Sequence, residues 1–184
     1  MAKTNASASL NNPARLKAFG KKRDDEIQVI VETPKGSRNK YAFDPEQRIF
    51  ELSKVLPEGM VFPYDFGFVP STKADDGDPL DVLILLDESV SVGCLVKCRV
   101  VGVIEGEQSG EDETVRNDRV LAVAKEAHTY ANIKDVQDLG KNMLSELEHF
   151  FTAYHDLRGE KYTVLGCKGA DKALKLIRKS QVKR

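Results

Sequence analysis

The chain lacks several patterns that would place it in a special class of protein. Its 184 residues include no tryptophan and only three cysteines, and 28 basic and 29 acidic residues leave a net charge of −1. An odd number of widely spaced cysteines argues against a disulfide framework and for a reducing compartment. The near-zero net charge offers no basic footprint for nucleic acid, so we expect no nucleic-acid partner.

Long hydrophobic runs are also missing. The longest, Val82 to Leu86, has the length of a strand and falls well short of the roughly 18 residues of a membrane span. Residues 1–12 are rich in Ala, Ser and Asn and lack the apolar segment of a secretory signal. We therefore expect a cytoplasmic protein with no membrane partner, in which residues 1–12 form a mobile N-terminal tail and residues 13–184 a single domain.

The most informative segment is the acidic run Asp75-Asp76-Gly77-Asp78-Pro79-Leu80-Asp81, directly before that apolar run. Clustered carboxylates repel one another, and a neighbouring buried strand makes the repulsion worse. A bound cation removes this cost, and oxygen-only ligands suit Mg²⁺, Mn²⁺ or Ca²⁺ rather than zinc. We expect Asp76, Asp78 and Asp81 to converge on one metal-binding pocket. The alternative is a solvated acidic turn, the usual form of an Asp/Gly/Pro cluster.

Hydrophobic periodicity predicts strands first and helices afterwards. Strands are expected at 27–32, 39–43, 48–52, 82–86, 94–104 and 120–124, and helices at 141–156 and 170–179. The polar segment 105–117, rich in Gly, Glu and Asp, is expected to form a loop. This order predicts an α+β protein, a small closed or partly closed β-barrel flanked by C-terminal helices.

Other polar residues combine carboxylates with cations. They are Glu32, Lys40, Lys54, Arg119, Tyr154 and His155. Each is usually structural when taken alone. Together they suit metal-assisted phosphoryl chemistry, in which carboxylates hold metal ions while cations and a tyrosine hydroxyl bind phosphate oxygens. The sequence has no Walker-type glycine loop and no Ser or Cys nucleophile motif, so water is the expected nucleophile.

From about residue 27 to 177 the sequence resembles the soluble family I inorganic pyrophosphatases. The most specific matches are Asp76 to Val82, which reads DGDPLDV, and Ile133 to Leu139, which reads IKDVQDL. The resemblance implies a five-stranded β-barrel of the OB type and a single pyrophosphatase-like domain at 13–184. It also implies hydrolysis of pyrophosphate to two phosphates by a metal-activated water. Several Mg²⁺ ions per active site, with Mn²⁺ as an alternative, and a homo-oligomer are further expectations.

The resemblance assigns a role to each candidate residue. Asp78 is the expected catalytic base; the expected metal ligands are Asp76, Asp81, Asp78 and Glu32; the expected substrate-binding residues are Lys40, Lys54, Tyr154, Arg119 and His155. Pyrophosphate adds negative charge, so further metal ligands are needed. We expect segment 105–118 to supply one, either Asp118 or a carboxylate among Glu107, Glu111 and Asp112.

Several positions depart from the family pattern. Ala42 stands where Glu is usual, Phe62 and Phe66 where Tyr is usual, Asn117 where a metal-binding Asp is usual, Lys54 where Arg is usual, and Arg119 and His155 where Lys is usual. Two alternative functions follow. One is a divergent phosphoanhydride hydrolase with an altered substrate, and the other is a catalytically weak paralogue that acts as an assembly or binding module.

Overall fold

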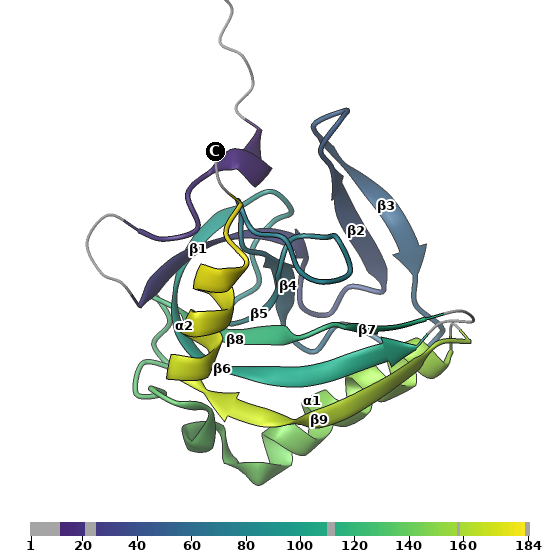
Figure 1. Cartoon of the computed structure of the whole chain (residues 1–184). Helices are drawn as coiled ribbons and strands as arrows, with labels where there is room; N and C mark the ends of the chain where they lie inside the picture. The colour runs from purple at the N-terminus through teal and green to yellow at the C-terminus, as the bar shows by residue number, and fades with distance from the viewer. Residues whose placement is uncertain (1–11, 21–24, 110–112, 158, 183–184) are drawn as a thin grey trace, which may run out of the picture.

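The core of the protein is a closed ring of five paired strands, which are labelled in Figure 1. The computed structural model describes residues 12–20, 25–109, 113–157 and 159–182. The ring strands are β1 (Glu26–Thr33), β4 (Asp65–Phe68), β5 (Asp81–Leu85), β8 (Arg119–Ala124) and β6 (Leu95–Ser109). Each pairs with the next in this order, and β6 pairs back to β1. The ring confirms the predicted five-stranded barrel.

One pairing within the ring is parallel, that of β5 with β8. Both strands are rich in Val, Leu and Ile, and all six residues of β8 are buried, as expected for strands covered on both faces. The register places Asp81 opposite Arg119 at the start of the two strands. Two residues distant in sequence therefore become neighbours at one end of the barrel.

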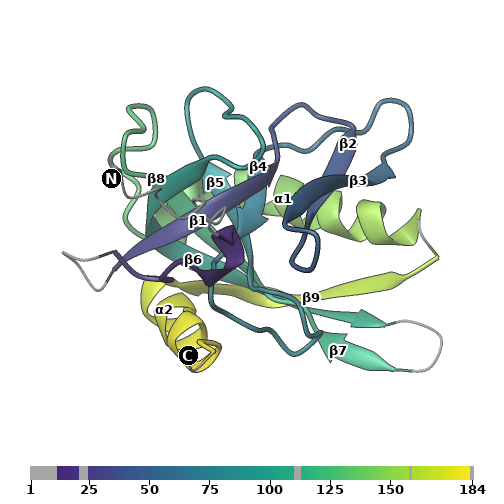
Figure 2. The same ribbon diagram turned by 90° about the horizontal axis from the view of Figure 1, so that it is seen from above.

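Two strands extend the sheet from β6 and a separate hairpin lies beside the ring. β7 (Thr114–Arg116) and β9 (Lys161–Gly169) both pair with β6. β2 (Asn39–Asp44) and β3 (Ile49–Val55) form the predicted hairpin, which stands apart from the ring when seen from above (Figure 2). The predicted loop at 105–117 is wrong, because β6 continues to Ser109 and β7 follows. Although this segment is polar, the backbone of residues 107–109 pairs with β7 on one edge and with β9 on the other.

The helices follow the barrel strands. They are η1 (Pro13–Arg15), η2 (Val136–Leu139), α1 (Gly140–Asp156) and α2 (Ala170–Lys179). The two predicted helices are confirmed to within one residue, and α1 runs along β9 (Figure 1). No helix in the described part of the chain is long and apolar enough to cross a membrane. Of the predicted tail, residues 1–11 lie outside the described residues, and Asn12 caps η1.

Close contact between β1 and β4 depends on Gly67. A methyl group there would collide with the carbonyl oxygen of Ile30 on β1. We expect Gly67→Ala to lower the free energy of unfolding by about 3 kcal/mol or more, because rigid backbone must shift. Gly59→Ala is the control, since Gly59 has φ of 80° and no atom within 4 Å of an added methyl, so it costs only about 1–2 kcal/mol. Urea denaturation measures both, and equal losses would contradict this account.

Candidate active site

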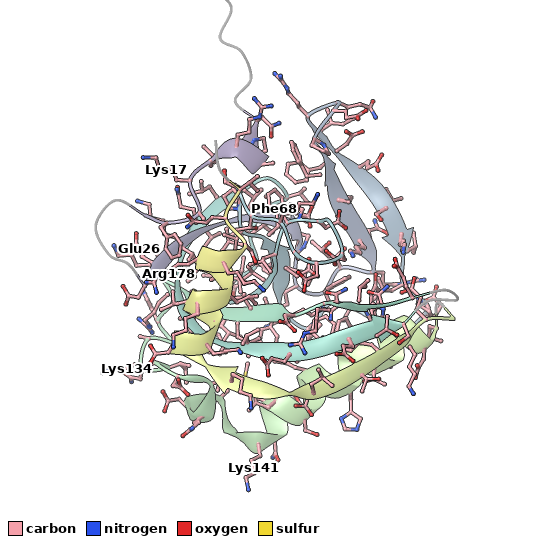
Figure 3. All side chains as sticks on the ribbon, in the orientation of Figure 1. Lys17, Glu26, Phe68, Lys134, Lys141 and Arg178 are labelled. Atoms are coloured by element: carbon pink, nitrogen blue, oxygen red, sulfur yellow. The ribbon has the colours of Figure 1, made fainter. Side chains whose placement is uncertain are left out.

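A cavity of about 250 Å³ opens between the acidic loop, the end of β1 and the β2–β3 hairpin. Four of the predicted site residues line it: Glu32, Lys40, Asp78 and Asp81. The remaining wall is mostly apolar and includes Ala42, Phe43 and Phe68. Phe68, labelled in Figure 3, stacks on Phe43 of β2 at a centroid distance of 6.1 Å. The cavity thus brings together acidic and basic side chains from segments that are far apart in the sequence.

Glu32 lies where β1 meets the hairpin. Its carboxylate accepts a hydrogen bond of 2.8 Å from the backbone N–H of Phe43. Burial raises the pKa of Glu32 to about 7, with the charges of Asp81 and Asp78 adding to the rise while the Phe43 bond and Lys40 oppose it. The Glu32 carboxyl therefore loses its proton near neutral pH. A cation bound beside it would shift this loss to lower pH.

The acidic loop turns at Gly77, whose φ of 96° is unfavourable for other residues. Within the turn, the backbone N–H of Asp78 donates to Oδ1 of Asp76 at 3.1 Å. Burial raises the pKa of both Asp81 and Asp76, and Arg119 partly offsets the rise at each. The charge of Asp78 adds to the rise in the pKa of Asp76. Asp76 is not among the residues that line the cavity.

The carboxylates of this cavity fit a hard divalent cation in their chemistry. Glu32, Asp78 and Asp81 offer only oxygen donors. The raised pKa values of Glu32 and Asp81 reflect mainly the burial of their carboxylates, to which neighbouring negative charge adds, and a bound cation relieves both costs. Among the described residues, however, no three acidic, histidine or cysteine side chains are already gathered closely enough to hold a metal ion. The donors are present without a preformed coordination shell.

Lys40 and Lys54 face each other across the hairpin. Lys40 reaches the cavity, and its ammonium lies 5.6 Å from the ring centre of Phe66 and 5.8 Å from that of Tyr154. Lys54 is exposed and does not line the cavity. The Tyr154 ring is buried against Phe62. Of these predicted phosphate-binding residues, the structure brings only Lys40 directly to the acidic cavity.

Arg119 and His155 lie behind Asp81 and are almost fully buried. The guanidinium of Arg119 packs against the rings of Phe151 and Tyr162, 4.2 and 4.3 Å from their centres. Its Nε is 3.9 Å from Oδ2 of Asp81. A guanidinium held by two aromatic rings beside a carboxylate is a positive charge of fixed position that can bind an anion.

Asp118 belongs to a different neighbourhood. It accepts a hydrogen bond of 3.0 Å from the N–H of Gly106 and pairs with Arg116 at 2.8 Å. It lines a second, smaller cavity of about 90 Å³ together with Asp75. Glu107 also pairs with Arg116, at 3.9 Å. Among the other carboxylates expected to bind metal, Glu111 and Asp112 lie outside the described residues.

Sequence reasoning missed several residues around Arg119. Gln108, Glu160 and Tyr162 all contact this region. Gln108 belongs to β6, Tyr162 to β9, and Glu160 directly precedes β9. The signal for β9 was present as the alternation Tyr162, Val164 in a segment between two helices. A strand there would have pointed to a partner strand, though not to which residues meet.

Comparisons with known proteins agree with this architecture. A family model described as "Inorganic pyrophosphatase" matches residues 29–183. The chain belongs to this family. The inorganic pyrophosphatase of Synechocystis is 37% identical over 151 residues, covering 82% of this chain and 87% of the relative. That of Saccharolobus solfataricus is 40% identical over 146 residues, covering 78% and 82%.

Solved structures give the same result. The crystal structure of inorganic pyrophosphatase from Thermus thermophilus superposes with a TM-score of 0.85 at 34% identity, covering 92% of this chain and 97% of that one. Membership of the pyrophosphatase family implies use of a divalent metal ion. The family match spans both the acidic loop and the Arg119 region, so the site lies entirely within the family's domain.

The raised pKa of Glu32 predicts how stability of the metal-free protein depends on pH. Between pH 4.5 and 7 the folded state binds more protons than the unfolded state, so stability falls as pH rises. Glu32→Gln removes this dependence. We expect the variant's stability relative to the parent to rise by about 2–3 kcal/mol from pH 5 to pH 8 in EDTA.

Urea denaturation at the two pH values measures this change. The control is Glu58→Gln, because Glu58 is exposed and pairs only with Arg38 in the described structure. Parallel pH profiles for the parent and Glu32→Gln would show that the Glu32 carboxyl carries no such burial cost.

Proposed function

We propose that this protein hydrolyses inorganic pyrophosphate to two phosphates with the help of Mg²⁺. The observation that carries the proposal is the convergence of Glu32, Lys40, Asp78 and Asp81 on one cavity in a pyrophosphatase-family barrel. Glu32, Asp76, Asp78 and Asp81 would hold the metal ions. When bound, these ions supply positive charge to the phosphate oxygens and lower the pKa of water.

The side chains then divide the remaining work. Asp78 is exposed at the rim of the cavity. It accepts a proton from the attacking water as the water oxygen forms a bond to phosphorus. The bridging P–O bond breaks, and its electron pair leaves on the second phosphate. Lys40 and Arg119 bind the substrate's negative oxygens, with Lys54 and Tyr154 at the margin.

Asp118 can hold a further metal ion only if its ion pair with Arg116 opens. Arg116 pairs with Asp118 at 2.8 Å and with Glu105 at 3.5 Å. The guanidinium therefore supplies the positive charge that these carboxylates would otherwise take from a cation. We propose Asp118 as a ligand of an outer ion that competes with Arg116 rather than of the ion held by the cavity carboxylates.

The location and assembly of the protein form a separate proposal. We propose a cytoplasmic homo-oligomer, supported by the family resemblance and by exposed apolar side chains on β3, namely Ile49, Leu52 and Val55. Sedimentation analysis of the purified chain tests the oligomer, and a monomer at micromolar concentration would exclude it.

A second candidate function is supported by the apolar cavity wall. Ala42, Phe43 and Phe68 offer a surface for an organic group, so a phosphoanhydride with such a group, for example a nucleoside diphosphate, is the alternative substrate. Phe62 and Phe66 do not contribute, because both are buried in an aromatic cluster and do not line the cavity.

A phosphate-release assay separates these functions. Pyrophosphate, tripolyphosphate, a nucleoside diphosphate and a nucleoside triphosphate are compared with Mg²⁺ and with EDTA. We expect pyrophosphate to be the best substrate and EDTA to abolish its turnover. Preference for the nucleotide would favour the second candidate, and no release from any substrate would favour a non-catalytic paralogue.

The proposed role of Asp78 predicts a specific loss of activity. Asp78→Asn removes the proton acceptor while leaving shape unchanged, so we expect kcat to fall by about 10²–10⁴-fold. Asp75→Asn is the matched control, because Asp75 is also an exposed aspartate of this loop but lines the smaller cavity. Circular dichroism verifies that both variants are folded. Similar kcat values for the two variants would remove Asp78 from the proton transfer.

A further inference from the structure

A buried chain of hydrogen bonds begins at Arg119. Its Nη2 lies 2.9 Å from Nε2 of His155. Because arginine stays charged and can only donate, Nε2 of the imidazole must be the acceptor. The ring proton is then on Nδ1, which lies 3.0 Å from Oε2 of Glu160 and donates to it. His155 is therefore neutral in this arrangement, and both of its nitrogens are engaged inside the protein.

The chain continues and returns to its origin. The same Oε2 of Glu160 accepts from Nε2 of Gln108 at 2.9 Å, and Oε1 of Gln108 accepts from Nδ2 of Asn117 at 2.7 Å. The backbone oxygen of Asn117 accepts from Nη1 of Arg119 at 3.3 Å. We call these five residues the Arg119 circuit. They come from β8, α1, β6 and the segments that precede β8 and β9.

The circuit leaves one direction of the guanidinium open. The rings of Phe151 and Tyr162 both pack against the guanidinium, and Tyr162 reaches this position only because residue 106 is glycine, where a methyl would collide with its hydroxyl. Nε is buried and has no hydrogen-bond partner among the described residues. That unpartnered donor lies on the Asp81 side, 3.9 Å from the carboxylate. A buried donor without a partner is costly unless a ligand satisfies it.

We infer that the Arg119 circuit is a positioning device for the substrate's phosphoryl group. His155, Glu160 and Gln108 act through Arg119 by holding its guanidinium in one orientation, with Nε directed toward the Asp81 side of the site. His155 is thus a positioning residue and not a direct phosphate ligand. Preorganised donors of this kind lower the cost of reorganisation in the transition state. The inference rests on the proposed function, in which Arg119 contacts the substrate.

Two pairs of variants test the circuit by its hydrogen-bonding capacity. His155→Leu and Glu160→Ala remove it, whereas His155→Gln and Glu160→Gln retain an acceptor and, at 155, a donor. We expect the first pair to lower kcat/KM for pyrophosphate by about 10–100-fold and the glutamine variants to recover most of that loss. Glu58→Ala, which removes a carboxylate from the exposed Arg38 pair, is the control and should retain parental values.

A double variant distinguishes one unit from two independent contacts. His155→Leu combined with Glu160→Ala should be no worse than either alone, because each breaks the same circuit. Additive losses, or a His155→Gln variant as poor as His155→Leu, would overturn the inference and favour direct phosphate binding by His155. If His155→Leu does not fold, Glu160→Ala and the two glutamine variants make the same comparison.

A spectroscopic measurement separates this inference from the proposed function. Nitrogen-15 NMR of the imidazoles at pH 7.5, with the His155 signal assigned from its loss in His155→Gln, should show the Nδ1–H tautomer in the parent. Glu160→Ala should shift the Nδ1 signal, because the Nδ1 proton loses its carboxylate acceptor, while Nε2 remains the acceptor of the Arg119 hydrogen bond. These results in a chain that does not hydrolyse pyrophosphate would refute the function and leave the circuit. An active parent with a protonated or Nε2–H imidazole would refute the circuit alone.

Discussion

The parallel pairing of β5 with β8 is the constraint on which the site depends. It places Asp81 opposite Arg119, and the two side chains approach to 3.9 Å at the end of the barrel. On the Asp81 side lie the carboxylates of the cavity, and on the Arg119 side lies the buried circuit. A slip of either strand by one residue would turn that strand's side chain, Asp81 or Arg119, to the opposite face and separate the two halves of the site.

The distribution of charge distinguishes two groups of carboxylates around the site. Asp118 and Glu105 are balanced by Arg116, so their negative charge is already compensated within the protein. In the cavity, burial is the main cause of the raised pKa values of Glu32 and Asp81, and the neighbouring cations, Lys40 at both residues and Arg119 at Asp81, offset that rise only in part. A divalent cation is bound most favourably where buried negative charge is compensated least by the protein's own cations.

The sequence allowed prediction of those parts of the fold that depend on local patterns. The hairpin, α1, α2 and the strand after the acidic loop follow from periodicity. Two carboxylates of the cavity, Asp78 and Asp81, follow from the close spacing of aspartates in the acidic loop. The sequence did not predict β9 or the full length of β6, because polar residues such as Glu105 and Glu107 occur there in paired strands. The circuit could not be predicted, since its members meet only through the pairing of β6 with β9 and the packing of α1.

Three of the departures from the family pattern are mutually dependent. A lysine at position 155 would place an ammonium against the guanidinium of Arg119, a buried repulsion that the neutral imidazole avoids. An aspartate at 117 would lose the N–H that Asn117 donates to Gln108 and would set two acceptors 2.7 Å apart. Asn117, Arg119 and His155 therefore satisfy one another's hydrogen-bonding requirements. They form a consistent alternative arrangement of this side of the site.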